Sequence, residues 1–204
     1  MISQILTASV IGLDVYKIFV EADINNSLPS ISIVGLPDTA INEAKERVRS
    51  AIKNSGYDFP NKKVVVNLAP ADIKKVGSYY DLPIAIGILA KMGVLEQTEF
   101  KDTAFIGELS LDGSIRSVAG VLPIAAGLKE HGIKTLVVPY DNAKEAAIIS
   151  GLTIIGAKNL VEIVNHFNEN SPEHEKIKPT VSNINDYMQE ENIANKYDFK
   201  DVKG

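Results

Sequence analysis

Hydrophobic and polar residues alternate along the first part of the chain. Residues 5–36 contain three short runs of alternating apolar and polar positions, and turn residues separate two of them near 25–29. A period of two is typical of half-buried strands, so we expect three antiparallel strands here. Apolar residues then recur at helical spacing over 41–52. This spacing predicts a helix that has Asp38 or Thr39 as its cap and packs one face on the sheet.

The rest of the compact region switches between strand and helix patterns. A β-branched run bounded by prolines predicts a buried strand, and apolar residues at helical spacing that stop at glycine predict helices. In chain order we predict a strand at 63–69, a helix at 81–92, a hairpin at 105–116 turning at Asp112-Gly113, a helix at 121–130, a strand at 135–139, a helix at 143–150 capped by Asn142, a strand at 152–155 and a helix at 160–167 capped by Asn159. This mixture predicts an α+β fold, with helices packed on a mixed β-sheet.

Length and composition predict one domain followed by a polar tail. A chain of 204 residues is long enough for a single core that buries about 70% of the unfolded surface. From residue 168 onward the sequence becomes polar and loses its apolar periodicity, so residues 168–196 are interpreted as a linker in which only 184–193 could form a weak helix. The chain has no cysteine, which excludes disulfides, thiolate zinc sites and cysteine nucleophiles.

The charge of the chain restricts its partners. A formal net charge of −5 argues against broad, non-specific adhesion to nucleic acid, which requires an excess of cations. The amino terminus lacks a basic region before an apolar stretch, and no apolar run is long enough to span a membrane. We therefore expect a soluble, cytoplasmic protein without a membrane partner.

A local basic patch is compatible with that charge. Basic residues recur every four positions on the first predicted helix, and lysine pairs flank the strand at 63–69. The candidate DNA-contacting residues are Lys45, Arg49, Lys53, Lys62, Lys63, Lys74 and Lys75. If the loops at Lys62 and Lys74 open toward the same side as that helix, these residues form one cationic groove for phosphates. The alternative is a solvated helix face whose charge is offset by Glu43 and Glu46.

Two segments have the outline of a protease active site. Residues 76–90 fit a glycine turn that enters an apolar helix, and 105–116 fit a hairpin. Together they resemble the proteolytic domain of Lon, in which the glycine turn carries a nucleophilic serine and a lysine just beyond the hairpin activates it. Alignment of the turns puts Tyr79 at the serine position and Leu122 at the lysine position. A phenol at its usual pKa is a poor nucleophile and leucine accepts no proton, so the resemblance implies that the fold is kept and the peptidase chemistry is lost.

Most of the chain resembles, in the same order, the amino-terminal domain of the magnesium-chelatase-like AAA+ ATPases of the ComM/YifB family. The resemblance is carried by residues 8–15, 31–38 and 64–71, the two segments above and the run up to 167. It implies the ribosomal protein S5 domain 2-like fold for a domain over 1–167, and the start of an ATPase domain at 197–204. The parent would be a cytoplasmic homo-hexameric ring that uses ATP and Mg²⁺ in its ATPase domain and promotes branch migration of DNA during natural transformation.

Two alternatives assign a function to the segments that resemble the Lon active site. Ser78 lies one residue before the expected nucleophile, and Lys129 lies one to two helical turns beyond Leu122, so a shifted serine–lysine pair is one alternative. Tyr79 and Tyr80 are expected to form an exposed aromatic pair that could stack on nucleic-acid bases or serve in packing.

Cofactor chemistry has little support in this chain. The glycines of 127–132 have the gap of a phosphate loop, but Ile133 replaces the required lysine, so ATP is expected only in the domain that follows. His131, His166 and His174 share no metal-ligand spacing. The favoured hypothesis is a non-catalytic domain that helps ring assembly or guides DNA. The alternatives are a shifted-site, Lon-like serine peptidase and a purely structural oligomerisation module.

Overall fold

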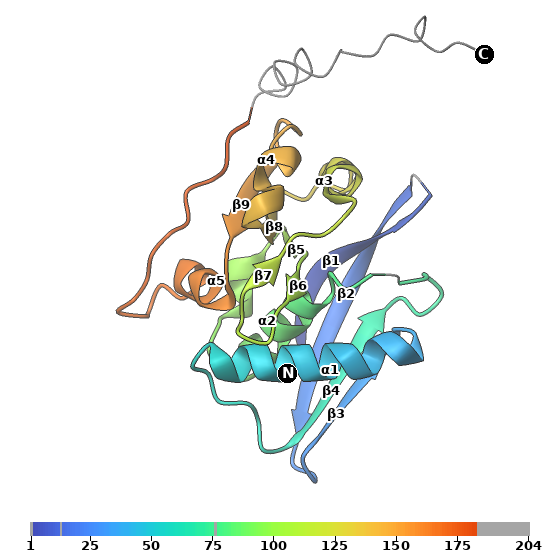
Figure 1. Ribbon diagram of the computed structural model, residues 1–204, viewed down its shortest axis with the longest axis vertical. Helices are drawn as coiled ribbons and strands as arrows, with labels where there is room; N and C mark the ends of the chain where they lie inside the picture. The colour runs from blue at the N-terminus through green and yellow to red at the C-terminus, as the bar shows by residue number, and fades with distance from the viewer. Residues whose placement is uncertain (1, 13, 76, 183–204) are drawn as a thin grey trace, which may run out of the picture.

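The computed structural model describes residues 2–12, 14–75 and 77–182. Within these residues a seven-stranded sheet has the order β3-β4-β2-β1-β5-β8-β9, and helices pack against it (Figure 1). The strands are β1 (Ser3–Ile11), β2 (Asp14–Asn25), β3 (Ser30–Val34), β4 (Lys63–Ala69), β5 (Thr103–Phe105), β8 (Thr135–Pro139) and β9 (Thr153–Ala157). The helices are α1 (Asp38–Asn54), α2 (Asp81–Lys91), α3 (Val121–Glu130), α4 (Ala143–Ala146) and α5 (Leu160–Phe167), with 3₁₀ turns η1 (Gln97–Phe100) and η2 (Tyr140–Asn142). A separate hairpin consists of β6 (Glu108–Leu109) and β7 (Ile115–Arg116).

The sheet is mixed, as the sequence predicts. Strand β2 runs antiparallel to both β1 and β4, and the other neighbouring pairs run parallel. The prediction of a third antiparallel strand is wrong, because β3 pairs in parallel with β4, with Ile31 opposite Val64. Helix α1 connects the two strands, and a helical crossover returns the chain to the same end of the sheet. Alternation in the sequence reports which face of a strand is buried but not the direction of the strand.

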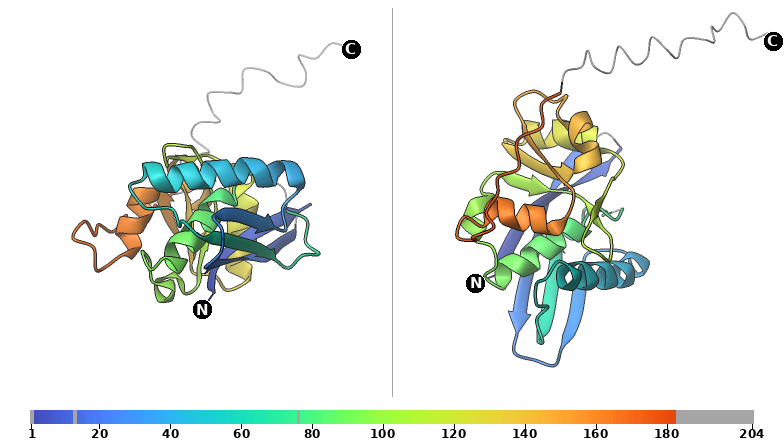
Figure 2. Two further views of the ribbon diagram at one scale, coloured as in Figure 1. Left: turned by 90° about the horizontal axis from the view of Figure 1, so that it is seen from below. Right: turned by 60° about the vertical axis from the view of Figure 1, so that its left-hand side comes forward.

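Helix α2 forms the centre of the core. Every residue from Asp81 to Leu89 is buried. The helix packs on β1 and β2, and α1 lies along its outer side (Figure 2). Helix α2 lies close to the sheet at Gly87, where a Cβ would be in ordinary contact with Ile5 at 3.5 Å and Ala22 at 3.6 Å. A helix that is apolar on nearly all sides is expected to be buried rather than to lie on the surface.

The helix ends differ from the sequence predictions in two places. The residue that precedes α1 is Pro37, and no side-chain cap hydrogen bond is present there, so the predicted cap at Asp38 or Thr39 is not the cap position. Helix α4 ends at Ala146, earlier than predicted; Asn142 occupies the cap position, as predicted, but its side chain makes no cap hydrogen bond. The cap of α5 is confirmed, because the Glu162 amide donates to Asn159 Oδ1 at 2.9 Å.

The polar segment that follows α5 lies against the domain as far as it is described. The Ile177 amide donates to His166 Nδ1 at 2.9 Å, and the Thr180 amide donates to the Ile154 carbonyl at 2.8 Å. This segment therefore covers part of α5 and the outer edge of β9. The predicted weak helix at 184–193 and the predicted start of an ATPase domain at 197–204 lie outside the described residues.

Two helical glycines are expected to respond oppositely to alanine. At Gly127 in α3 a Cβ would lie 2.4 Å from the Cβ of Val15 in β2, so the helix must move away from the sheet. We expect Gly127→Ala to lower the free energy of unfolding by about 2 kcal/mol. At Gly87 the nearest atom would lie 3.5 Å away, so Gly87→Ala should be neutral or raise stability by up to about 1 kcal/mol. Urea unfolding measures both changes, and a Gly127→Ala variant as stable as the parent would contradict the close packing of α3 on β2.

Candidate functional site

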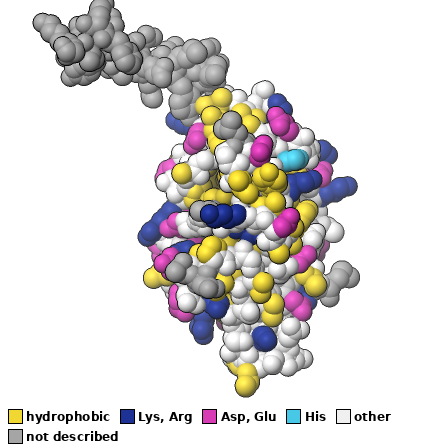
Figure 3. Space-filling model, turned by 90° about the vertical axis from the view of Figure 1, so that its right-hand side faces the viewer, with side chains coloured by type: hydrophobic (Ala, Val, Ile, Leu, Met, Phe, Trp, Pro, Cys, Tyr) yellow, Lys and Arg dark blue, Asp and Glu magenta, His cyan; other side chains and the backbone are white. Residues whose placement is uncertain are grey.

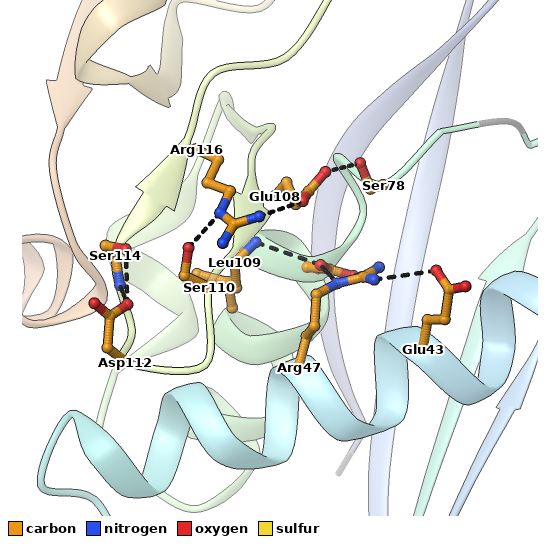
Figure 4. Close-up of polar contacts among 10 residues, drawn as sticks. Glu43, Arg47, Ser78, Glu108, Leu109, Ser110, Asp112, Ser114 and Arg116 are labelled. Carbon is orange, nitrogen blue, oxygen red and sulfur yellow. Dashed lines mark hydrogen bonds and ion pairs between the residues drawn. The ribbon is translucent and has the colours of Figure 1, made fainter.

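The glycine turn that resembles the nucleophile turn of Lon leads directly into α2. Gly77 has a positive φ of 102°, a conformation that favours glycine, and Ser78 follows it. The Ser78 hydroxyl donates to the carboxylate of Glu108 on β6, and Arg116 on β7 lies 3.8 Å from the same carboxylate (Figure 4). Arg116 also donates to Ser110 Oγ at 2.6 Å. The serine is therefore held by a hairpin carboxylate that is itself paired with an arginine.

A buried carboxylate lies at the start of α2. Asp81 is 1% exposed, and it accepts from Arg47 Nε at 2.6 Å and from the Leu109 amide at 3.3 Å. Arg47 comes from α1 and lies 3.3 Å from Glu43 on the same helix (Figure 4). Burial raises the pKa of Asp81 to about 6, although hydrogen bonding to Arg47 lowers it. The pair joins α1, α2 and β6 at one point in the core.

The two tyrosines of the turn pack into the protein. Tyr80 is 1% exposed and Tyr79 is half-buried. Their ring centroids lie 4.6 Å apart, and their hydroxyl oxygens lie 3.4 Å apart. Burial raises the pKa of Tyr80 well above its usual value, so this hydroxyl stays neutral. The expectation of an exposed aromatic pair is corrected, because the Tyr80 ring fills the core and is not available to stack on bases.

The lysine position of the Lon-like pair has no base. Leu122 lies in the first turn of α3, where its amide donates to Glu145 Oε1 at 3.3 Å. Lys129 is exposed in the last turn of α3. The Ser78 hydroxyl donates instead to Glu108. A carboxylate is a much weaker base than an amine, so this hydrogen bond does not reproduce a serine–lysine pair.

Part of the predicted basic patch gathers beside β3. Arg49, Lys53 and Lys62 line a hollow of about 330 Å³ together with Phe59 and the first residues of β3. The Arg49 guanidinium carbon lies 5.9 Å from the centroid of the Phe59 ring. Lys45 lies one helical turn before Arg49, and Lys63 is exposed at the start of β4. We define the basic strip as Lys45, Arg49, Lys53, Lys62 and Lys63.

The other predicted lysines do not join this strip. Lys74 and Lys75 follow the far end of β4, and this seven-residue strand separates them from Lys62 by about 20 Å. Lys75 is 2% exposed, and its ammonium donates to the carbonyls of Pro70 and Ile73. The prediction of a phosphate contact at Lys75 is corrected, because its ammonium is buried and hydrogen-bonded to carbonyls of its own loop. Elsewhere on the surface, as on the face drawn in Figure 3, basic and acidic side chains are interspersed.

The histidines contact backbone groups. His131 Nε2 lies 2.9 Å from the Val15 carbonyl, and His174 Nδ1 lies 2.8 Å from the Asn165 carbonyl. Over the part of the chain that the structure describes, no group of three or more His, Asp or Glu side chains is placed to hold a metal ion. Over the same part, no helix has both the length and the apolar character of a membrane span.

Comparison with known proteins identifies the family. A family model described as subunit ChlI of Mg-chelatase matches residues 20–142. The chain belongs to this family. The protein YifB of Escherichia coli K12 is 41% identical over 179 residues, which cover 88% of this chain and 35% of that protein. The competence protein ComM of Haemophilus influenzae is 39% identical over 158 residues, covering 77% of this chain and 31% of that protein.

The Lon resemblance is also confirmed, at greater distance. Lon protease 2 of Bacillus subtilis is 27% identical over 134 residues, which cover 64% of this chain and 23% of that protease. The chain spans about a third of the length of its ChlI-family relatives YifB and ComM.

Sequence reasoning missed several residues that shape this site. Asp81 stands alone at the start of an apolar helix, and a lone carboxylate in such a run signals a buried partner. That signal does not say which arginine supplies the partner, and Arg47 lies on a different helix. No sequence pattern predicts that Glu108 bonds Ser78 or that Phe59 lines the hollow, because both contacts join segments that are distant in sequence.

Removal of Arg47 is expected to destabilise the protein in a pH-dependent way. In Arg47→Leu the buried Asp81 carboxylate has no cation, and such losses typically cost about 3 kcal/mol of unfolding free energy. The folded pKa of Asp81 lies above its ordinary value of 3.8, so the protonated acid favours folding. That contribution is lost as the pH rises from about 4 to about 6. Removal of Arg47, which lowers the pKa of Asp81, raises the folded pKa of this carboxyl further. The additional penalty develops above about pH 6, so the cost of Arg47→Leu should be larger at pH 7.5 than at pH 5.

Urea unfolding at the two pH values measures this difference. Asp81→Asn supplies the matched control, because an amide has no charge to neutralise. Addition of Arg47→Leu to Asp81→Asn should lower stability by less, and by the same amount at both pH values. An equal cost of Arg47→Leu at both pH values in the parent chain would contradict the assignment of Asp81 as the titrating group.

The Ser78 hydroxyl is expected to lack nucleophilic activity. We expect no turnover of casein above that of Ser78→Ala, and no labelling by a fluorophosphonate, because the hydroxyl has no amine base. Ser78→Ala should lower the free energy of unfolding by about 1 kcal/mol through the lost hydrogen bond to Glu108. Casein turnover that vanishes in Ser78→Ala would instead establish a shifted-site peptidase.

Proposed function

We propose that this chain is the non-catalytic amino-terminal domain of a ComM/YifB-like AAA+ ATPase and that it contacts DNA through the basic strip. The observation that carries this proposal is the hollow in which Arg49, Lys53 and Lys62 converge from two separate segments. The DNA contact would guide the strand toward a motor in the same parent protein. Assistance in ring assembly is a further part of the proposed role.

The contacts of the Lon-like turn support a binding role rather than acyl transfer. Tyr79 is half-buried beside Tyr80, and the neighbouring Ser78 hydroxyl donates to a carboxylate. Acyl transfer by serine needs a base that accepts the hydroxyl proton at working pH. The turn that performs chemistry in a peptidase therefore serves here to connect α2 with the β6–β7 hairpin.

The arrangement of the basic strip supports a phosphate contact. Lys45, Arg49 and Lys53 form one row along α1, and Lys62 extends the row from the loop before β4. A row of cations about one helical turn apart can contact successive phosphates of a nucleic-acid backbone. Such contacts carry no sequence information, which suits a domain that guides DNA of any sequence.

The properties of the parent protein belong to the same proposal. The name of the Haemophilus relative, competence protein ComM, supports a task in DNA uptake. We propose a cytoplasmic homo-hexamer that binds ATP and Mg²⁺ in its ATPase domain and promotes branch migration, with no cofactor in the present chain. The similarity to Lon protease 2 supports assignment of the domain to the ribosomal protein S5 domain 2-like fold.

Fluorescence anisotropy of labelled single-stranded and branched DNA tests the contact. We expect saturable binding that weakens as salt is raised. The double variant Arg49→Glu with Lys53→Glu should lower the affinity at low salt by roughly tenfold or more, because two phosphate contacts become repulsive. It should also reduce the slope of affinity against salt by about one for each lost contact.

The matched control changes the same charge elsewhere. Lys129→Glu with Lys144→Glu alters the net charge equally, and both residues are exposed on other helices. This control should bind DNA nearly as well as the parent chain. Equal losses in the two double variants would show that only net charge matters, and no loss in either would remove the basic strip from DNA contact. Absence of DNA binding together with concentration-dependent assembly would favour the oligomerisation module.

A further inference from the structure

The two outer edges of the sheet differ in how they are covered. At β9 the following segment lies along the edge, where the Thr180 amide donates to the Ile154 carbonyl at 2.8 Å in an antiparallel bridge. At the opposite edge β3 pairs only with β4. Among the described residues, no backbone hydrogen bond of another segment reaches the outer side of β3. One edge is thus covered and the other is open.

Strand β3 lacks the features that usually prevent pairing of an edge. Its sequence, Ser-Ile-Ser-Ile-Val, contains no charged residue and no proline. It pairs with β4 in continuous register from Ser30 to Val34, so it has no bulge. Val34 is 54% exposed, and Leu28 just before the strand is 86% exposed. An uncovered edge with apolar residues and free backbone groups is a template for an added strand.

Basic residues lie beside this edge, so the charge of a partner affects its binding there. Arg49 and Lys53 line the same hollow as Ser30 and Ile31, so these cations lie beside the start of β3. Lys45 precedes Arg49 by one turn on α1. A second copy that paired through its own β3 would offer these cations no opposite charge, because β3 contains no acidic residue. An added strand that carries carboxylates would instead place opposite charges side by side.

We propose that the open edge of β3 binds an extended acidic peptide segment of a partner polypeptide as an additional parallel or antiparallel strand. The backbone of the segment supplies the ladder hydrogen bonds, and its carboxylates contact Arg49, Lys53 and Lys62. Main-chain pairing gives affinity and alternate side chains give specificity in this mode of recognition. The proposal does not depend on DNA binding, but it uses the same cations, so the peptide and DNA exclude each other.

Hydrogen exchange and anisotropy with defined peptides test the proposal on the full chain. The probe is a labelled synthetic peptide, Thr-Glu-Val-Glu-Val-Glu-Thr, and the control is Thr-Gln-Val-Gln-Val-Gln-Thr, which has the same length and no carboxylate. We expect the acidic peptide to bind and to slow exchange of the outward β3 amides by about fivefold or more. The neutral peptide should bind more weakly, and Arg49→Glu with Lys53→Glu should abolish the difference between the two peptides.

Three other outcomes would each overturn the proposal in a distinct way, and a fourth would leave it standing. Peptide binding without protection of β3 amides would mean a charge contact and no added strand. Equal binding of both peptides would remove the basic strip from recognition. Protection that appears with rising protein concentration and no peptide would assign the edge to a second copy. If the chain binds the acidic peptide but does not bind DNA, the proposed DNA contact is contradicted and the peptide proposal stands. The two proposals can therefore be distinguished.

Discussion

Helix α2 is buried along nearly its whole length, and its first residue carries a carboxylate into the core. The apolar residues from Leu82 to Leu89 require cover on every side, which β1, β2 and α1 provide. The Asp81 carboxylate requires a cation and a donor, which Arg47 and the Leu109 amide provide. This one buried pair therefore fixes α1 and the β6–β7 hairpin relative to α2. The position of the basic strip follows, because α1 carries most of it.

The same constraint gives the residues of the Lon-like turn structural contacts. The residue at the nucleophile position packs against Tyr80, whose ring is part of the core, and the neighbouring serine donates to Glu108 on the hairpin. Glu108 in turn lies near Arg116. These contacts hold the turn, the hairpin and α2 together. The turn at the position of the Lon nucleophile thus connects α2 with the β6–β7 hairpin.

Much of the architecture was predictable from local pattern. Hydrophobic periodicity predicts β4, α3 and β8 with their observed bounds. The cap at Asn159 is also predictable, because a cap hydrogen bond joins residues that are close in sequence. The parallel pairing of β3 was not predictable from alternation, since strand direction depends on the crossover through α1. The basic strip was predictable only in part, because helical spacing relates Lys45, Arg49 and Lys53, whereas the burial of Lys75 depends on the loop at Pro70. The lone Asp81 in an apolar helix indicates a buried partner, but no local pattern identifies that partner as Arg47 on another helix.

Photo-crosslinking tests the central claim that this domain contacts DNA through the strip beside α1. The full-length parent protein would be bound to single-stranded DNA containing 4-thiothymidine, irradiated and digested, and the crosslinked peptides identified by mass spectrometry. Crosslinks are expected within residues 45–63, and they should be lost in Arg49→Glu with Lys53→Glu while crosslinks in the proposed ATPase domain remain. Crosslinks confined to the ATPase domain, or located in this domain only around Lys74 and the Lon-like turn, would contradict it.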